Sequence, residues 1–292
     1  MRTQTRPDHR APVRPRTSPD TLHKLIRRLT PRDREIMRLV WEHRTFTTEQ
    51  LSRLAFGSYN VAKKRLAALY GLRALDRFRP WTAVGSAPWH YILDSPGAEI
   101  LAAEQDKSVK EFGYRRDRTL TLAYRSSLAH TVGVNSVFVD LYAHTRHHGT
   151  HLRWWTAARC AEQWGDIVRP DAAGRWTEAD SRTGFYLEYD TGTESLRRLV
   201  AKLDAYAELA RLTSHRGVVL FWLPSKERET HLRHRLAHPP VPTATAVHGA
   251  HPADAVWARL SDPTAHRYRL SELTAGPMTV QPPLPGWEET GG

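Results

Sequence analysis

Apolar residues recur every three or four positions in three short segments near the amino end, which predicts three amphipathic helices. The predicted helices cover about residues 31–43, 49–54 and 60–70. Each follows a hydroxyl residue that can cap its first turn, namely Thr30, Thr47 and Ser58. Three helices of this length with tight connections, the last one basic, are typical of a helix-turn-helix.

The stretch from Ala74 to Leu93 alternates between apolar and polar residues and predicts two strands. The alternation breaks at Gly85-Ser86-Ala87-Pro88 and resumes over residues 89–93. A further helix is expected at 98–104. Helices and strands together predict a winged helix-turn-helix over residues 23–106.

The pattern after residue 118 predicts a second domain, over residues 119–275. Its expected order is helix, three strands, helix, strand and helix. The expected elements lie at 120–142, 152–158, 166–172, 183–190, 194–212, 217–223 and 226–237. Residues 107–118 are charged and weakly patterned, so we predict a linker there. The fold class is therefore α+β with two domains.

Both ends of the chain lack the apolar residues needed for a core. Residues 1–22 are rich in arginine and proline and predict a disordered basic arm, which is either a solvated tail or a contact to a phosphate backbone. Residues 276–292 predict a flexible tail.

Positive charge is concentrated in the amino-terminal part of the 292-residue chain, whose formal net charge is +12. Residues 1–120 hold 24 Lys and Arg against 13 Asp and Glu, whereas the remainder holds 19 against 18. This asymmetry predicts that the amino-terminal part binds a polyanion, and double-stranded DNA is the partner that a winged helix fits.

Composition narrows the class of protein further. The single cysteine, Cys160, excludes an internal disulfide framework and favours a reducing compartment, so we expect a cytoplasmic protein. No apolar run approaches the roughly 18–20 residues needed to cross a bilayer, and we expect no membrane contact.

The third predicted helix supplies the first candidate site. Its side chains can enter the major groove, and arginines on the first wing strand can reach the phosphate backbone. The DNA-contact candidates are Asn60, Lys63, Lys64, Arg65, Arg77 and Arg79.

Carboxylates at the ends of two predicted strands supply the second candidate site. Glu188 and Asp190 are two residues apart and share one face of a strand, and Asp171 ends the neighbouring strand. Such a set repels itself unless a cation lies between its members, and oxygen-only ligands suit Mg²⁺ or Mn²⁺. We therefore predict Asp171, Glu188 and Asp190 as metal ligands that serve phosphodiester chemistry.

Four histidines, at positions 144, 147, 148 and 151, have a spacing that suggests a metal site. No carboxylate or cysteine accompanies them, and we expect them in a solvated loop rather than around zinc.

The carboxylate pattern resembles the core of PD-(D/E)XK nucleases, whose element order matches the predicted one. More specifically, residues 28–225 resemble the replication-relaxation proteins of actinobacterial plasmids and mobile elements, through RPDA followed by LEYDTGTESLRRLVAKLDAY. The resemblance implies a winged helix joined to a nuclease-like domain. It also implies a lysine two residues after Glu188, where this chain has Asp190, and Lys202 on the next helix can supply that ammonium.

Two functions from different classes remain open. One is a DNA-binding Mg²⁺-dependent nickase or endonuclease acting in plasmid replication, relaxation or transfer, with Asp171, Glu188, Asp190 and Lys202 as catalytic residues. The other is a non-catalytic regulator or replication accessory protein. Its second domain would form a homodimer or dock replication or transfer proteins.

Overall fold

In the computed structural model, hydroxyl caps start the three helices that the sequence predicts near the amino end. The model describes residues 14–80, 82, 85–121, 127–213, 216–236, 238–262, 264 and 266–273. The three predicted helices are α2 (Pro31–Glu42), α3 (Thr48–Ala55) and α4 (Tyr59–Gly71). Thr30 and Thr47 each form a reciprocal capping box with the residue three positions on. The local signals were therefore sufficient to place these helices.

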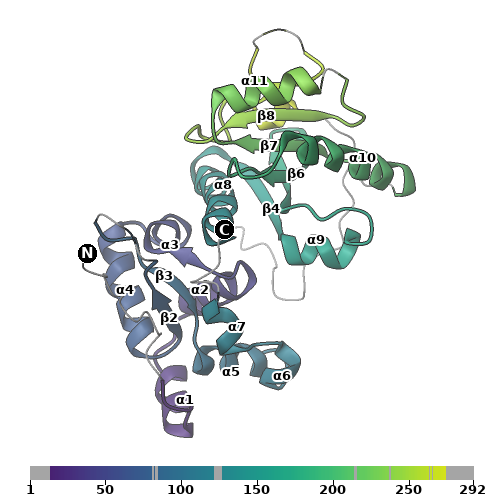
Figure 1. Cartoon of the computed structure of the whole chain (residues 1–292). Helices are drawn as coiled ribbons and strands as arrows, with labels where there is room; N and C mark the ends of the chain where they lie inside the picture. Colours follow the sequence, from purple (N-terminus) through teal and green to yellow (C-terminus); the bar gives the residue numbers. More distant parts are fainter. Residues whose placement is uncertain are drawn as a thin grey trace, which may run out of the picture. The chain divides into compact units, whose positions relative to one another are not determined.

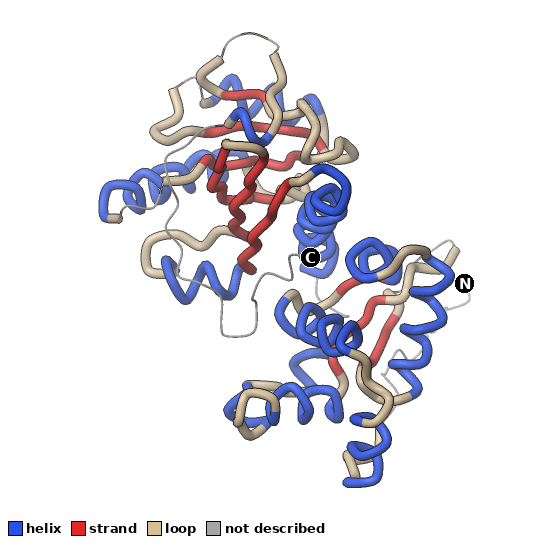
Figure 2. Tube along the Cα trace, turned by 180° about the vertical axis from the view of Figure 1, so that it is seen from behind, coloured by secondary structure: helices blue, strands red, loops and turns tan. Residues whose placement is uncertain are grey.

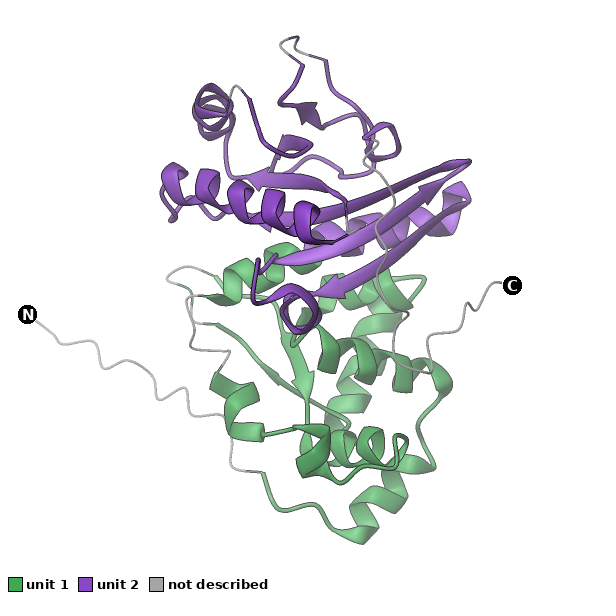
Figure 3. Ribbon diagram, turned by 90° about the vertical axis from the view of Figure 1, so that its right-hand side faces the viewer, with its two compact units in different colours: residues 1–135 green, residues 136–292 purple. Residues whose placement is uncertain are grey.

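Two compact units divide the chain, residues 1–135 and 136–292 (Figure 3). The first contains α1 (Pro19–Ile26), a small sheet, α5 (Ser95–Ala103), α6 (Val109–Phe112) and α7 (Arg116–Thr121). In the described residues this sheet has the order β1-β3-β2, with β1 at Phe46–Thr47, β2 at Leu75–Phe78 and β3 at His90–Leu93. The two predicted strands are present as β2 and β3.

Two segments expected to be irregular are partly helical. The predicted arm includes the start of α1, because Ser18 caps that helix and Pro19 occupies its first turn. The predicted linker 107–118 contains α6, which Ser108 and Glu111 cap reciprocally, and the start of α7. Residues 1–13 of the arm and the tail 276–292 lie outside the described residues.

The long helix α8 (Ser127–His148) contributes to both units, whose division falls between Asn135 and Ser136. Asn135 is buried and donates through Nδ2 to the carbonyl oxygens of His43, at 3.2 Å, and Thr45, at 2.7 Å. These bonds attach the first half of α8 to the amino-terminal unit.

A mixed sheet forms the centre of the second unit (Figure 1). In the described residues its order is β4-β5-β6-β7-β8-β9. The strands are β4 (Thr150–Thr156), β5 (Ala172–Glu178), β6 (Ser181–Tyr189), β7 (Val218–Leu223), β8 (Thr243–Val247) and β9 (Ala258–Arg259). Strands β6, β7 and β8 run parallel, and the other pairs are antiparallel.

Helices flank both faces of this sheet (Figure 2). The core on one face joins Tyr186 of β6 to side chains from α9 (Ala157–Trp164), α10 (Leu196–Leu212) and α11 (Lys226–Arg235). On the other face, Phe138 of α8 stacks against Phe185, with ring centroids 5.8 Å apart. Alternation along β6 therefore directs the even-numbered side chains toward α10.

Two predictions within the second unit were wrong. Residues 166–171 precede β5 instead of forming a strand, and the preceding residues form α9, because Thr156 caps that helix. The histidines at 144, 147 and 148 end α8 and do not lie in a loop. The strand that follows residues 166–171, β5, contains Gly174, whose missing side chain leaves room for the Phe185 ring.

The helices that the structure describes include none with the length and apolar character that a membrane span requires.

Candidate functional site

Helix α4 presents one face to solvent and buries the other. Ala62, Leu66 and Leu69 are buried, in the spacing that one helix face requires. The predicted contacts Asn60, Lys63 and Lys64 are exposed. Neither lysine has an ion-pair partner among the described residues, so both ammonium groups are available to an external anion.

Arg65, predicted as a DNA contact on the same helix, is engaged inside the unit. Its Nε donates to Oδ1 of Asp33 at 2.9 Å, and a terminal nitrogen donates to the carbonyl oxygen of Arg28 at 2.9 Å. Asp33 is completely buried and caps α2. Burial tends to raise the pKa of Asp33, but hydrogen bonds from Arg65 and Thr30 outweigh burial and lower the pKa. The ion pair between Arg65 and Asp33 therefore links α4 to α2.

The two predicted wing arginines stack on aromatic rings. The Arg77 guanidinium carbon lies 4.3 Å from the centroid of the Tyr70 ring and 4.0 Å from that of Trp89. Arg79 lies 4.1 Å above the same Trp89 ring and is exposed. Stacking orders both side chains without neutralising their charge.

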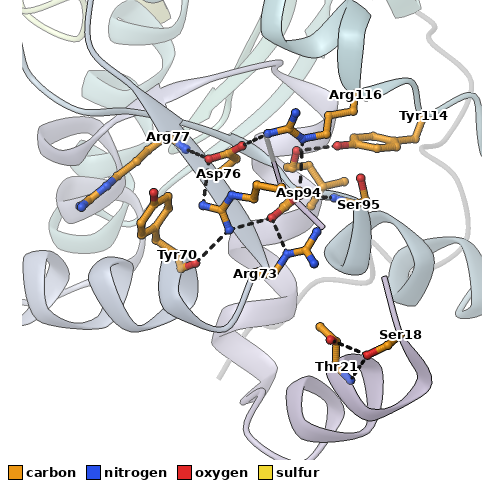
Figure 4. Close-up of polar contacts among 12 residues, drawn as sticks. Ser18, Thr21, Tyr70, Arg73, Asp76, Arg77, Asp94, Ser95, Tyr114 and Arg116 are labelled. Atoms are coloured by element: carbon orange, nitrogen blue, oxygen red, sulfur yellow. Dashed lines mark hydrogen bonds and ion pairs between the residues drawn. The ribbon is translucent and has the colours of Figure 1, made fainter. Parts of the chain in front are cut away.

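Two buried carboxylates at the base of the β2–β3 hairpin, Asp76 and Asp94, form ion pairs with arginines (Figure 4). Asp76 accepts from Arg116 at 2.8 Å, and Asp94 accepts from Arg73 at 3.3 Å. Arg14 bridges the two carboxylates, with both contacts at 3.0 Å. Arg14, Arg73 and Arg116 are therefore engaged inside the unit.

In the second unit, Glu188 of β6 is buried between two side chains of α10. Lys202 Nζ lies 2.6 Å from Oε2 of Glu188, and the Tyr206 hydroxyl donates to Oε1 at 2.6 Å. Lys202 and Tyr206 are four residues apart and share one face of the helix. Tyr206 was not among the predicted site residues, although its spacing from Lys202 is the signal that connects the two.

Burial, with a contribution from nearby Asp171, raises the pKa of Glu188 to about 7. Burial tends to lower the pKa of Lys202, but the Glu188 carboxylate outweighs burial and raises it. Near neutral pH the ammonium therefore keeps its proton, and Glu188 is the member of the pair that titrates.

The other two predicted metal ligands have different surroundings. Asp171 precedes β5 and accepts a hydrogen bond from the backbone N–H of Tyr189 at 2.8 Å. Because Tyr189 follows Glu188 and Ala172 pairs with Leu187, Asp171 and Glu188 lie near the same end of the β5–β6 pair.

Asp190 is engaged elsewhere. Its Oδ1 accepts from the N–H of Gly192 at 2.8 Å, and its Oδ2 accepts from Arg228 of α11. Arg228 also donates to the carbonyl oxygen of Glu194, so the loop between β6 and α10 is held at two points. Gly192 has φ +84° in this loop, a conformation that favours glycine. Asp190 therefore fixes the loop.

Within the described ranges, no group of three or more His, Cys, Asp or Glu side chains is placed to hold a metal ion. The predicted trio thus reduces to the neighbouring Asp171 and Glu188. The histidines of α8 stack instead, with the rings of His144 and His148 3.7 Å apart.

The model of a protein family described as replication-relaxation matches residues 37–219. The match covers more than half of the 292-residue chain. The chain belongs to the replication-relaxation family. Comparison with curated proteins and with solved structures finds no match.

The stretch matched to the replication-relaxation family contains the exposed face of α4, the β2–β3 hairpin and the contacts between Glu188 and α10. Arg228 lies beyond its end, and Asp33 lies before its start. No local pattern in the sequence indicates either partner, because each ion pair joins residues more than thirty positions apart.

Proposed function

We propose that this replication-relaxation protein binds double-stranded DNA in plasmid replication or relaxation, using α2, α3, α4 and the β2–β3 hairpin as a winged helix-turn-helix. The observation that carries the proposal is the exposed face of α4, where Lys63 and Lys64 lack ion-pair partners in the described chain. A helix of this kind fits the major groove, and lysines contribute through phosphate contacts.

Small residues continue the exposed face of α4 toward its carboxyl end. Ala67, Ala68 and Gly71 are exposed there, so the helix backbone can approach a groove closely. The exposed side chains of Tyr59 and Val61 at the opposite end can contact base edges such as the thymine methyl group. On the hairpin, Arg79 is the exposed arginine that can reach a phosphate.

The test compares Lys63→Ala/Lys64→Ala with Lys107→Ala/Lys110→Ala in the full chain. All four lysines are exposed in the same unit, and the two variants have the same net charge. Fluorescence anisotropy with a duplex of mixed sequence would give the affinity at several salt concentrations. We expect only the α4 variant to bind more weakly. The slope of log binding constant against log salt concentration (the salt slope) should become shallower by about 2, since each lost phosphate contact contributes about 0.9. Equal binding by both variants would remove α4 as the docking surface.

We further propose a second activity, metal-dependent DNA nicking in a PD-(D/E)XK-like second unit. The contact between Lys202 and Glu188, with Asp171 adjacent, favours it. Oxygen donors of Asp171 and Glu188 suit Mg²⁺ or Mn²⁺. The Asp190 oxygens are held by Gly192 and by Arg228 of α11, in the loop that leads to α10. Such a cation would stabilise charge on a phosphodiester and activate water. Lys202 would hold its ammonium against the same carboxylate, and Tyr206 would fix the carboxylate's orientation.

Conversion of supercoiled plasmid to open-circular DNA with Mg²⁺ or Mn²⁺ tests this activity. Lys202→Met should abolish conversion, while Lys226→Met, which changes an exposed lysine on α11, should retain it. Both variants should bind DNA like the unmodified chain. If the unmodified protein binds DNA but does not convert the plasmid, the non-catalytic accessory function replaces nicking.

A further inference from the structure

Strand pairing in the second unit brings three arginines together on one sheet face. Arg153 of β4 lies directly opposite Arg175 of β5. Arg182 of β6 pairs with Thr177, and therefore lies diagonally next to Arg175 on the same face. Nothing in the sequence predicts this cluster, because the unit as a whole is close to neutral and the three residues come from three strands.

The cluster is electrostatically unfavourable as it stands. Like charges directly opposite each other destabilise a strand pair. Burial lowers the pKa of Arg175, and the charges of Arg153 and Arg182 lower it further. Arg153 and Arg182 are exposed, and neither forms an ion pair with another residue that the structure describes. An anion bound beside the exposed Arg153 and Arg182 would reduce the repulsion between the arginines.

The position of the cluster indicates the size of that anion. Neighbouring strands lie about 4.8 Å apart, so guanidinium groups from three adjacent strands cover a width of about 10 Å. A surface of this width can contact more than one phosphate of a nucleic-acid backbone. Arg182 and Glu188 point to the same face of β6 and are six residues apart, which corresponds to about 20 Å along the strand.

We propose that Arg153, Arg175 and Arg182 form a second DNA-backbone contact surface, separate from α4 and located on the sheet face that contains Glu188. The choice of DNA as the polyanion rests on the proposed DNA-binding function. The cluster would hold the backbone without reading its sequence, since guanidinium contacts to phosphate carry no base information. The cluster and Glu188 lie on the same face of β6, with the buried Tyr186 between them under α10.

The experiment uses the full chain with Arg153→Ser/Arg182→Ser, and Arg197→Ser/Arg235→Ser as the matched control. The control arginines are exposed on α10 and at the end of α11, and they also lack ion-pair partners among the described residues. Anisotropy titrations with duplex DNA should show a salt slope reduced by about 2 in the cluster variant and little changed in the control. Arg153→Lys/Arg182→Lys should restore most of the slope, because the charge returns.

Thermal unfolding of the cluster variant should occur at the same or a higher temperature than that of the unmodified protein, because repulsion is removed. This result separates lost contacts from lost folding. Equal salt slopes for the cluster and control variants would overturn the second surface. If the Lys63→Ala/Lys64→Ala variant still binds weakly in that case, the proposed function survives and only the second surface fails.

Discussion

Replacing Arg65 by methionine should destabilise the amino-terminal unit, although the residue lies on the helix proposed to bind DNA. In the structure, Arg65 Nε contacts Oδ1 of Asp33 at 2.9 Å, and a terminal nitrogen of Arg65 also donates to Oδ2. Methionine keeps much of the aliphatic volume and removes the cation. The Asp33 carboxylate, buried in the structure, would then keep only Thr30 as a partner within the protein.

The expected magnitude follows from the burial of the two side chains. Removing one partner of a fully buried ion pair costs about 3–5 kcal/mol. Here the Asp33 side chain is 1% exposed but that of Arg65 is 31% exposed, so water can partly replace the guanidinium. The free energy of unfolding should therefore fall by about 1–3 kcal/mol. Lys64→Met, at an exposed neighbouring position, should change it by less than about 0.5 kcal/mol.

Urea unfolding followed by circular dichroism at several pH values is the assay. The pKa of Asp33 is lowered in the folded protein, so its contribution is present above the unfolded pKa and disappears as the pH falls through the folded pKa. The difference in unfolding free energy between the unmodified protein and Arg65→Met should therefore be largest near neutral pH and shrink below about pH 4. The reasoning is refuted if Arg65→Met unfolds like Lys64→Met at pH 7, or if its deficit does not change with pH.

Three further outcomes follow from the second unit. The pKa of Glu188 is raised to about 7, so its contribution to stability should decline as pH rises through that value. In thermal unfolding, the Glu188→Gln variant should lack this decline of the melting temperature with pH. Gly174→Ala should lower the unfolding free energy by about 1–3 kcal/mol in urea titrations, because a Cβ atom there would lie 2.3 Å from the Phe185 ring. Arg228→Met should loosen the loop that Asp190 holds, seen as faster amide exchange at Gly192; unchanged exchange would contradict that role.

Local signals were reliable where one side chain and its own helix decide the outcome. Thr30, Thr47 and Ser58 start helices because a hydroxyl satisfies backbone N–H groups within the next turn. The relation between Lys202 and Tyr206 is also local, since four residues on a helix return to the same face.

The strand prediction at 166–172 failed because the segment follows directly on α9 and only its last residue enters β5. Residues 166–168 include two apolar side chains that favour a strand. In the structure, the backbone N–H groups of Ile167 and Val168 instead donate to the carbonyl oxygen of Trp164 at the carboxyl end of α9. The true strand, β5, contains Gly174, which reads as a turn residue until Phe185 is placed against it. Packing between neighbouring strands therefore overrode local preference.

By itself, the sequence determined the charge asymmetry and the family resemblance, because both depend only on the identity and order of the residues. It also determined the helix starts, because a cap acts within one helical turn. Only the tertiary structure decided which charges are available. Arg65 looked equivalent to Lys64 in the sequence, yet its ion-pair partner Asp33 lies 32 residues away. Asp190 looked equivalent to Glu188, yet Asp190 pairs with Arg228, 38 residues away, and Glu188 pairs with Lys202 of α10. Ion pairing depends on distance in space, and that distance follows from how the helices and strands pack.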